Sequence, residues 1–197
     1  MTSRELIALD LRHLWHPAAQ MKDYEMFPPL VVSSASGPFL YTADGTAVID
    51  AISSWWCKSL GHCHPEIRAA VDRQLNRFEH VIFANTTNDT IVRFAVKMAS
   101  LCPGLDRVFL ADNGSTSVEI AMKMSLQYHL QTGHGEKNGF FALHNGYHGE
   151  SILTLAAGDC EVYSRPFVAV LPHIDKTGPL VYCDGPGTTG WDSYPEA

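Results

Sequence analysis

The sequence has no apolar run long enough to cross a membrane. A stretch of about 18 apolar residues would be needed, and none occurs among the 197 residues. The first residues, MTSRELIALDLRHLWHP, carry acidic side chains and lack the continuous apolar segment of a secretory signal peptide. We therefore expect a cytoplasmic protein without a membrane partner.

Basic tracts are missing as well. The formal net charge is −7, and the 14 lysines and arginines do not form a run. Proteins that bind nucleic acid or anionic membranes usually present a basic face. The charge distribution therefore argues against nucleic acid and favours small molecules as partners.

The five cysteines form neither a disulfide framework nor a zinc motif, because their number is odd and no CxxC pair occurs. The densest group of metal-ligating side chains is WWCKSLGHCHPE, with Cys57, His62, Cys63 and His64. Adjacent residues of an extended segment point to opposite faces, and no second group of ligands is evident. We predict no metal site and interpret the segment as a loop leading into a helix at Pro65. Metal binding is the weaker alternative.

The apolar pattern predicts a mixed α and β chain without internal repeats. Residues 38–52 show two short strands around an Asp44-Gly45 turn, which is typical of a hairpin. Two amphipathic helices follow, one behind Pro65 and one behind Asn88 as its cap.

The next segments alternate between strand and helix. A short strand is predicted at 107–111, a helix from about Thr116 to Gln131, and a further strand at GFFALH, residues 139–144. Such alternation favours a parallel sheet covered by helices, in which ligands bind beyond the carboxyl ends of the strands. The loops DNGSTS and HNGYHG both occupy that position.

The first loop has the features of an anion site. Gly114 permits a tight turn, and Ser115 and Thr116 place hydroxyl and N–H groups at the start of a helix, whose dipole favours an anion. Simple capping explains the same residues equally well, with Thr116 and Glu119 as a capping box. The loop lacks the lysine of a Walker A motif and the GxGxxG spacing, which argues against nucleotide-binding folds.

The second loop presents Tyr147 and His148 between glycines. A tyrosine ring beside an anion site could stack on a flat heterocycle, and the imidazole could hydrogen-bond or exchange protons nearby. Together the two loops suggest a phosphorylated aromatic cofactor. The alternative is a Tyr–His turn that only covers the end of the sheet.

Two adjacent tryptophans, Trp55 and Trp56, follow the hairpin in SSWWCK. Consecutive side chains of an extended chain point to opposite sides. We therefore predict that one ring is buried and that the other forms the wall of a pocket.

Five stretches carry a family resemblance: RHLWHP, SSWW, GHCHPEI, VFLADNGSTSVEIAMKMSLQY and NGYHGES. Over about residues 10–165 the chain resembles the N-terminal half of class III, fold-type I pyridoxal-phosphate aminotransferases. HLWHP and SSWW resemble in particular the members of that class that act in biotin biosynthesis. The resemblance implies an α/β fold, with a small N-terminal α+β segment followed by an incomplete, mostly parallel sheet covered by helices. Residues 1–65 would contribute to the small domain, 66–183 would form the first part of the large cofactor-binding domain, and 184–197 an irregular tail.

The resemblance also implies roles for individual residues. Gly114 and Ser115 match the turn that holds the phosphate of pyridoxal 5'-phosphate, and Tyr147 matches the ring that stacks on the pyridine and borders the substrate. Trp55 matches the aromatic wall of the substrate pocket, and His148 would have a supporting role. The implied reaction moves the amino group of S-adenosylmethionine to 8-amino-7-oxononanoate in a homodimeric enzyme.

The chain departs from the family pattern in two respects. It has HPAA, with Ala18, where the family usually has HPYT, which leaves the amino donor open. It also ends before the family's Schiff-base lysine, which transamination requires, and its own lysines match no such motif: Lys22, Lys58, Lys97, Lys123, Lys137 and Lys176. We expect no catalytic residue in this chain and no activity of the chain alone. The alternatives are a fragment of another class III ω-aminotransferase and a non-catalytic remnant that binds a full-length partner.

Overall fold

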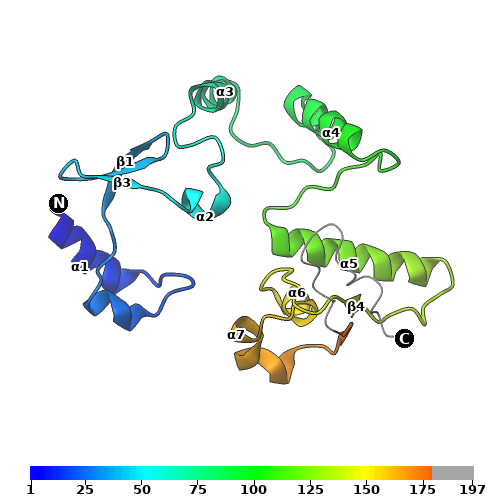
Figure 1. Ribbon diagram of the computed structural model, residues 1–197. Coiled ribbons are helices and arrows are strands. Elements are labelled where there is room, and N and C mark those ends of the chain that lie inside the picture. The colour runs from blue at the N-terminus through cyan, green and yellow to red at the C-terminus, as the bar shows by residue number, and fades with distance from the viewer. Residues whose placement is uncertain (179–197) are drawn as a thin grey trace, which may run out of the picture. The chain divides into compact units, whose positions relative to one another are not determined.

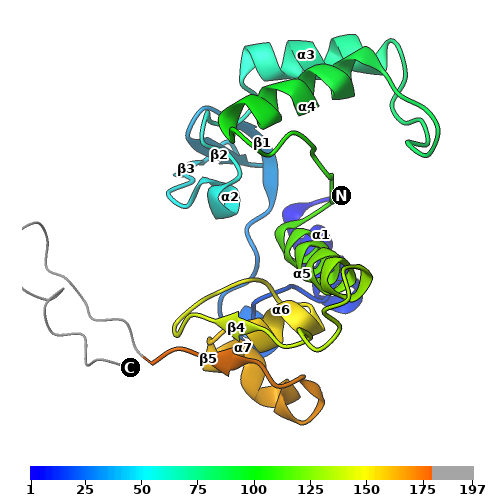
Figure 2. The same cartoon turned by 90° about the vertical axis from the view of Figure 1, so that its right-hand side faces the viewer.

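The structure is a computed structural model and describes residues 1–178. The chain divides into two compact units, of which the first is Met1–Thr87 and the second begins at Asn88 (Figures 1 and 2). The domain boundary predicted after residue 65 refers to the small and large domains that the family resemblance implies. These compact units do not test it, and it stays a prediction. The predicted tail at 184–197 lies outside the described residues.

The predicted hairpin is confirmed. Strands β2 (Phe39–Thr42) and β3 (Ala47–Ile49) pair antiparallel on either side of the Asp44-Gly45 turn. Gly45 has a φ of +86°, which glycine adopts without steric cost. The Asp44 carboxylate accepts a hydrogen bond of 3.1 Å from the Thr46 N–H, and this closes the turn.

A third strand, β1 (Val32–Ser36), pairs antiparallel with β2 and completes a sheet of order β1-β2-β3. We did not predict this strand. Serine and alanine dominate its sequence, VSSAS, and neither residue favours strands by itself. Pairing with the neighbouring hairpin therefore decides its conformation.

Helix α1 (Ser3–His13) and helix α3 (Pro65–Leu75) begin at clear start signals. The Thr2 hydroxyl accepts a hydrogen bond from the Glu5 N–H, and the Glu5 carboxylate accepts one from the Thr2 N–H, which makes a capping box. Helix α3 begins at Pro65, as predicted, because proline has no N–H to leave unpaired in the first turn. A 3₁₀ turn, η1 (Met21–Glu25), lies between α1 and β1.

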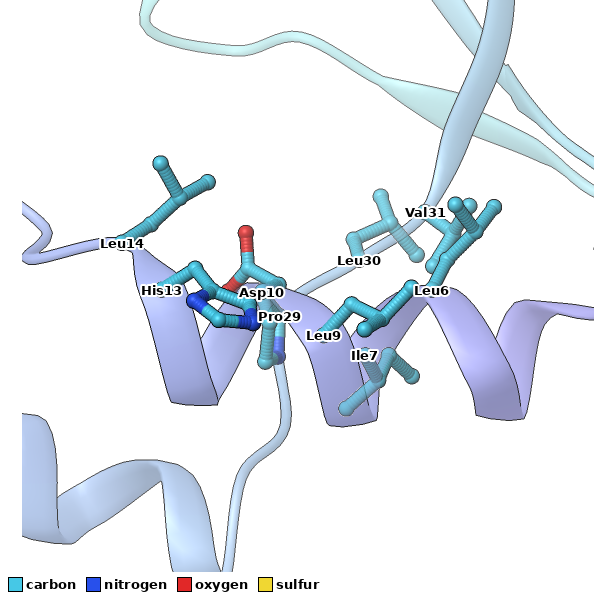
Figure 3. A pocket seen from close by; sticks show the side chains of 9 residues that line it. All are labelled: Leu6, Ile7, Leu9, Asp10, His13, Leu14, Pro29, Leu30 and Val31. Atoms are coloured by element: carbon cyan, nitrogen blue, oxygen red, sulfur yellow. The ribbon is translucent and has the colours of Figure 1, made fainter.

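An apolar groove of about 460 Å³ runs along α1 (Figure 3). Leu6 and Leu9 of the helix face Leu30 and Val31 of the segment that leads into β1. Asp10 also borders the groove, but its carboxylate is paired with the His16 imidazole at 2.6 Å. The rest of the lining is apolar except for the His13 imidazole, so the groove offers mainly shape and apolar surface.

The second unit begins with α4 (Asp89–Leu101), and its predicted cap is confirmed, because the Asn88 side chain accepts a hydrogen bond of 3.0 Å from the Ile91 N–H. Helix α5 (Gly114–Gln131) ends as predicted but starts two residues earlier. Asn113 is its cap, so the predicted capping box at Thr116 is wrong.

The predicted strand at 107–111 is also wrong for this structure: these residues are irregular and find no strand partner within residues 1–178. GFFALH forms only a short strand, β4 (Phe141–Ala142), which pairs parallel with β5 (Asp175–Lys176). A strand needs a neighbour to accept its hydrogen bonds. Of the predicted parallel sheet, the described residues therefore contain one parallel pair of strands, β4 and β5.

The core of the second unit surrounds helix α6 (Ile152–Ala157), which lies against α5 (Figures 1 and 2). Ala156 and Ala157 are buried together with Ile174, which directly precedes β5. Met122 of α5 and residues beside β4 pack around them. The short elements α7 (Glu161–Ser164) and η2 (Arg165–Val170) follow and contact one another.

Helices α3 and α4 keep their apolar faces exposed. Neither contains a buried residue, and Val71 and Phe94 have exposed fractions of 52% and 47%. Their amphipathic patterns were predicted correctly, but within the described residues nothing covers them. No described helix combines the length and the apolar content that a bilayer-spanning segment requires.

Candidate functional site

The two loops singled out in the sequence meet at one pocket of about 470 Å³. Asn113, Gly114 and Ser115 line it from the start of α5, and Tyr147, His148 and Gly149 line it from the loop before α6. Val118, one turn further along α5, completes the lining. The structure therefore brings together Gly114, Ser115, Tyr147 and His148, which lie more than 30 positions apart in two groups.

The first turn of α5 has two N–H groups to offer. The Asn113 side chain accepts a hydrogen bond from the Thr116 N–H at 2.8 Å, and the Asn113 backbone carbonyl accepts one from the Ser117 N–H at 3.1 Å. The N–H groups of Gly114 and Ser115 have no partner among residues 1–178. Unpaired N–H groups and the positive end of the helix dipole both favour an anion at this position.

Ser115 also connects the two loops. Its Oγ accepts a hydrogen bond of 3.1 Å from the Glu150 N–H. The hydroxyl hydrogen is still available as a donor, because a serine hydroxyl both donates and accepts. Ser115 can therefore fix the second loop and donate to an anion in the pocket at the same time.

Gly149 is the residue that lets the loops approach so closely. A Cβ atom added there would lie 2.1 Å from the Ser115 Oγ and 2.9 Å from the Ser115 Cα. Its φ of +125° is in addition a conformation that other residues rarely adopt. The glycine that follows Tyr147 and His148 is thus required by the contact between the loops.

Tyr147 presents an accessible ring beside the pocket, with an exposed fraction of 60%. Its hydroxyl donates a hydrogen bond of 3.0 Å to the Glu150 carboxylate, and that hydrogen bond is the main reason why the pKa of Tyr147 is raised. The Tyr163 ring lies nearby, at 6.0 Å between centroids. Tyr147 is therefore held through its hydroxyl, and its exposed ring is open to a stacking partner.

Glu119 also connects α5 to the second loop and α6, although its spacing from Thr116 predicts a capping box. It lies one turn after Ser115 on the same side of α5, and its Oε1 accepts a hydrogen bond of 3.0 Å from the Leu153 N–H. A hydrogen bond from the Ser151 hydroxyl is the largest cause of the lowered pKa of Glu119, followed by the one from Leu153. Ser115 thus holds the loop before α6 at Glu150, and Glu119 holds the start of α6 at Leu153.

Trp55 and Trp56 belong to the first unit, and their local structure differs from the prediction. Residues Ser53–Trp56, element α2, form a left-handed turn in place of an extended segment. Both rings are exposed, at 62% and 81%, so the prediction that one of them is buried is wrong. A turn places neighbouring side chains on adjacent sides, whereas an extended strand would have put them on opposite faces. The role of Trp55 as a substrate wall stays a prediction.

One member of the histidine and cysteine cluster, His62, pairs with a carboxylate. The His62 Nε2 lies 2.7 Å from the Asp50 Oδ2. Within the described part of the chain, no three histidine, cysteine or acidic side chains are grouped so that they could hold a metal ion.

Solved transaminases share this fold. The crystal structure of adenosylmethionine-8-amino-7-oxononanoate aminotransferase from Methanocaldococcus jannaschii superimposes with a TM-score of 0.87 at 28% identity, over 93% of this chain and 42% of that one. A thermostable (S)-enantioselective omega-transaminase from Thermomicrobium roseum has a TM-score of 0.85 at 27% identity, over 98% and 44%. These matches confirm the predicted fold class.

The class-III aminotransferase family model matches residues 19–180, and the chain belongs to this family. The family implies pyridoxal 5'-phosphate as cofactor. Among curated relatives, the proteins named adenosylmethionine-8-amino-7-oxononanoate aminotransferase from Geobacter sulfurreducens and Helicobacter pylori are 35% and 38% identical, over 88% and 84% of this chain. The chain spans 39% and 38% of their lengths, which is about two fifths. The predicted family resemblance is confirmed.

Proposed function

We propose that the chain contributes the phosphate-binding and ring-stacking part of an aminotransferase that transfers an amino group from S-adenosylmethionine to 8-amino-7-oxononanoate. The observation that carries the proposal is the pocket in which the N–H groups of Gly114 and Ser115, unpaired within residues 1–178, lie beside the exposed Tyr147 ring. The names of the relatives support the substrates. We further propose that the complete enzyme is a cytoplasmic homodimer, as the family resemblance implies.

The residues of the pocket fit pyridoxal 5'-phosphate. The phosphate would accept hydrogen bonds from the Gly114 and Ser115 N–H groups and from the Ser115 hydroxyl, and Tyr147 would stack on the pyridine ring. A Cβ added at Gly114 would meet no atom within 4 Å, so there is space beside the helix start for a bound group. The bound cofactor would supply an electron sink for amino transfer. The residues described here would bind it and orient its ring.

Replacing Ser115 with aspartate should weaken pyridoxal 5'-phosphate binding. The new carboxylate would repel the phosphate and would remove the hydroxyl donor, so we expect at least about a tenfold loss of affinity, equivalent to ~1.4 kcal/mol. The affinity can be measured by titration with absorbance or tryptophan fluorescence as the signal.

Ser117→Asp is the matched control, because Ser117 belongs to the same helical turn but does not line the pocket. It should change the affinity much less. Equal affinities of the parent and the Ser115→Asp variant would mean that Ser115 only connects the two loops and does not bind the phosphate.

Binding of the cofactor to this chain should be non-covalent. Within the described residues no lysine lines the pocket, and covalent attachment requires a lysine amine. After borohydride reduction with pyridoxal 5'-phosphate, mass spectrometry of residues 1–197 should find no lysine that is labelled stoichiometrically. Stoichiometric labelling of one lysine, with turnover of S-adenosylmethionine, would show that the chain contains its own catalytic amine.

A second candidate function is that of a class III ω-aminotransferase with another amino donor. Ala18 in place of the family tyrosine and the structural match to the Thermomicrobium roseum enzyme favour it. An amino-donor screen of the complete enzyme distinguishes the two. Activity with S-adenosylmethionine supports the first proposal, and activity restricted to diamines or ω-amino acids supports the second.

A further inference from the structure

We propose that Asp50 is a positioning residue, whose carboxylate holds the left-handed turn Ser53–Trp56 and thereby fixes the place of the Trp55 ring. The inference rests on the proposed function in one respect, namely that Trp55 contacts the substrate. The geometry of the turn itself depends on no substrate.

The turn has an unfavourable backbone conformation that needs external support. Four consecutive residues have positive φ angles, 49° at Ser53, 46° at Ser54, 62° at Trp55 and 64° at Trp56. In this region the Cβ atom of an L-residue crowds the following carbonyl, so residues other than glycine normally visit it singly. A run of four persists only where neighbouring groups stabilise it.

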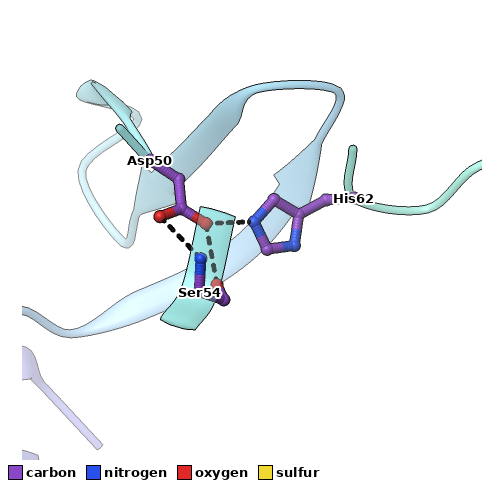
Figure 4. Close-up of polar contacts among 3 residues, drawn as sticks. All are labelled: Asp50, Ser54 and His62. Carbon is purple, nitrogen blue, oxygen red and sulfur yellow. Dashed lines mark hydrogen bonds and ion pairs between the residues drawn. The ribbon is translucent and has the colours of Figure 1, made fainter. Parts of the chain in front are cut away.

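Asp50 provides that support directly (Figure 4). Its Oδ1 accepts a hydrogen bond of 3.0 Å from the Ser54 N–H, and its Oδ2 accepts one of 2.7 Å from the Ser54 hydroxyl. The second residue of the turn is thus bound through both its backbone and its side chain. Trp55 follows immediately, so its Cα position is set by the same contacts.

Asp50 is itself fixed by the sheet. It directly follows β3, and its N–H donates a hydrogen bond of 2.9 Å to the Pro38 carbonyl beside β2. Its side chain has an exposed fraction of only 6%. The hydrogen bonds from the Ser54 N–H and hydroxyl, followed by that from His62, lower the pKa of Asp50 to about 2. Asp50 is therefore a rigid anionic acceptor at neutral pH.

His62 ties the carboxylate to the turn between β1 and β2, at the same end of the sheet. Its Nε2 lies 2.7 Å from the Asp50 Oδ2, and its side chain has an exposed fraction of 11%. Its backbone exchanges two hydrogen bonds with Gly37, between β1 and β2, at 2.8 and 3.1 Å. Gly61 lies so close to Gly37 that an added Cβ would be 3.1 Å from the Gly37 backbone. The contacts therefore run without interruption from the sheet through His62 and Asp50 to the tryptophan turn.

The same three side chains do not form a hydrolytic triad. In a triad the serine hydroxyl donates to the histidine, and the carboxylate orients the histidine from its far side. Here the Ser54 hydroxyl donates to the carboxylate, and His62 contacts the same carboxylate oxygen (Figure 4). The His62 imidazole contacts the carboxylate and not the serine hydroxyl, so the arrangement serves to hold the turn.

The test uses residues 1–197 labelled with 5-fluorotryptophan and observed by fluorine NMR. The resonances of Trp55 and Trp56 among the four tryptophans are assigned with single Trp→Phe variants. Asp50→Ala should shift or broaden both resonances beyond the parent linewidth and should leave the other two in place. Asp50→Asn keeps an acceptor for the Ser54 N–H and should give a smaller change.

Asp44→Asn is the matched control, because Asp44 also accepts a backbone N–H in this sheet but does not contact the turn. It should leave the Trp55 and Trp56 resonances unchanged. Unchanged resonances in a folded Asp50→Ala or Asp50→Asn variant overturn the proposal. Equal shifts of all four tryptophans in both the Asp50 and Asp44 variants also overturn it, since they indicate general loss of the sheet. No cofactor or substrate is needed, so the result is independent of the proposed reaction.

Discussion

Replacing Gly149 with alanine should separate the two loops of the pocket. Among glycine-to-alanine substitutions in the pocket, it should cause the largest loss of stability. The new Cβ would lie 2.1 Å from the Ser115 Oγ, and the backbone φ of +125° would be strained. Strain and overpacking together should lower the free energy of unfolding by about 2–5 kcal/mol. Denaturant unfolding followed by circular dichroism measures this loss, and cofactor titration should show weaker binding.

Gly139→Ala is the control for that substitution. Gly139 lies just before β4 in the same unit, has no strained φ, and an added Cβ would meet no atom within 4 Å. Its replacement should leave stability and cofactor affinity close to those of the parent. If Gly149→Ala behaved like Gly139→Ala, the close approach of Ser115 and Gly149 would not exist in solution.

Replacing Glu119 with alanine should loosen the start of α6, where the second loop ends, from α5. The variant leaves the N–H of Leu153 without its carboxylate acceptor, whereas the Ser151 hydroxyl keeps the Thr154 hydroxyl as a partner. Hydrogen bonds to a charged group contribute about 1.5–3 kcal/mol, so a loss of stability of that order is expected. Because the same loop presents Tyr147, cofactor affinity should fall in parallel.

The pH dependence of that contact follows from the direction of the pKa shift. Folding lowers the pKa of Glu119 from 4.5, so the folded protein favours the ionised carboxylate. Its contribution is therefore fully present above pH 4.5 and is lost as the pH falls through the lower pKa of the folded state. Glu119→Gln should remove this part of the acid sensitivity, measured as unfolding free energy against pH.

Glu136→Gln is the matched control, because the Glu136 side chain has an exposed fraction of 70% and lies outside the pocket. Its replacement should leave the acid dependence of stability unchanged. An identical acid profile in the parent and the Glu119→Gln variant would contradict the assigned contact between Glu119 and the loop.

Local signals in the sequence predicted the elements whose cause is local. Asn88 caps its helix through a residue three positions away, and Pro65 starts a helix because of its own ring. The hairpin around Asp44 likewise depends on a turn and two adjacent strands. The pocket residues were predicted from the loop composition together with the family resemblance, and the structure brings the two loops together.

The predictions that were wrong concern contacts between residues distant in sequence, or a backbone conformation that no sequence pattern indicates. Glu119 is spaced correctly for a capping box with Thr116, but its carboxylate binds Leu153, 34 positions away. Asn113 occupies the cap position because its side chain reaches the Thr116 N–H. The left-handed turn at Trp55 depends on Asp50 and His62, and spacing alone cannot predict such a network.

The burial of α6 implies an uneven pattern of amide hydrogen exchange in the second unit. Thr154 is fully enclosed, and Leu155, Ala156 and Ala157 have exposed fractions of 6% or less. Amides at such positions exchange only when a cooperative part of the structure opens. The exposed helix α4 should exchange by local fraying, whereas the C-terminal half of α6 should retain its protons longest. The pocket loop would thus lead into the helix that ends in the slowest-exchanging segment, which limits how far Tyr147 can move without unfolding.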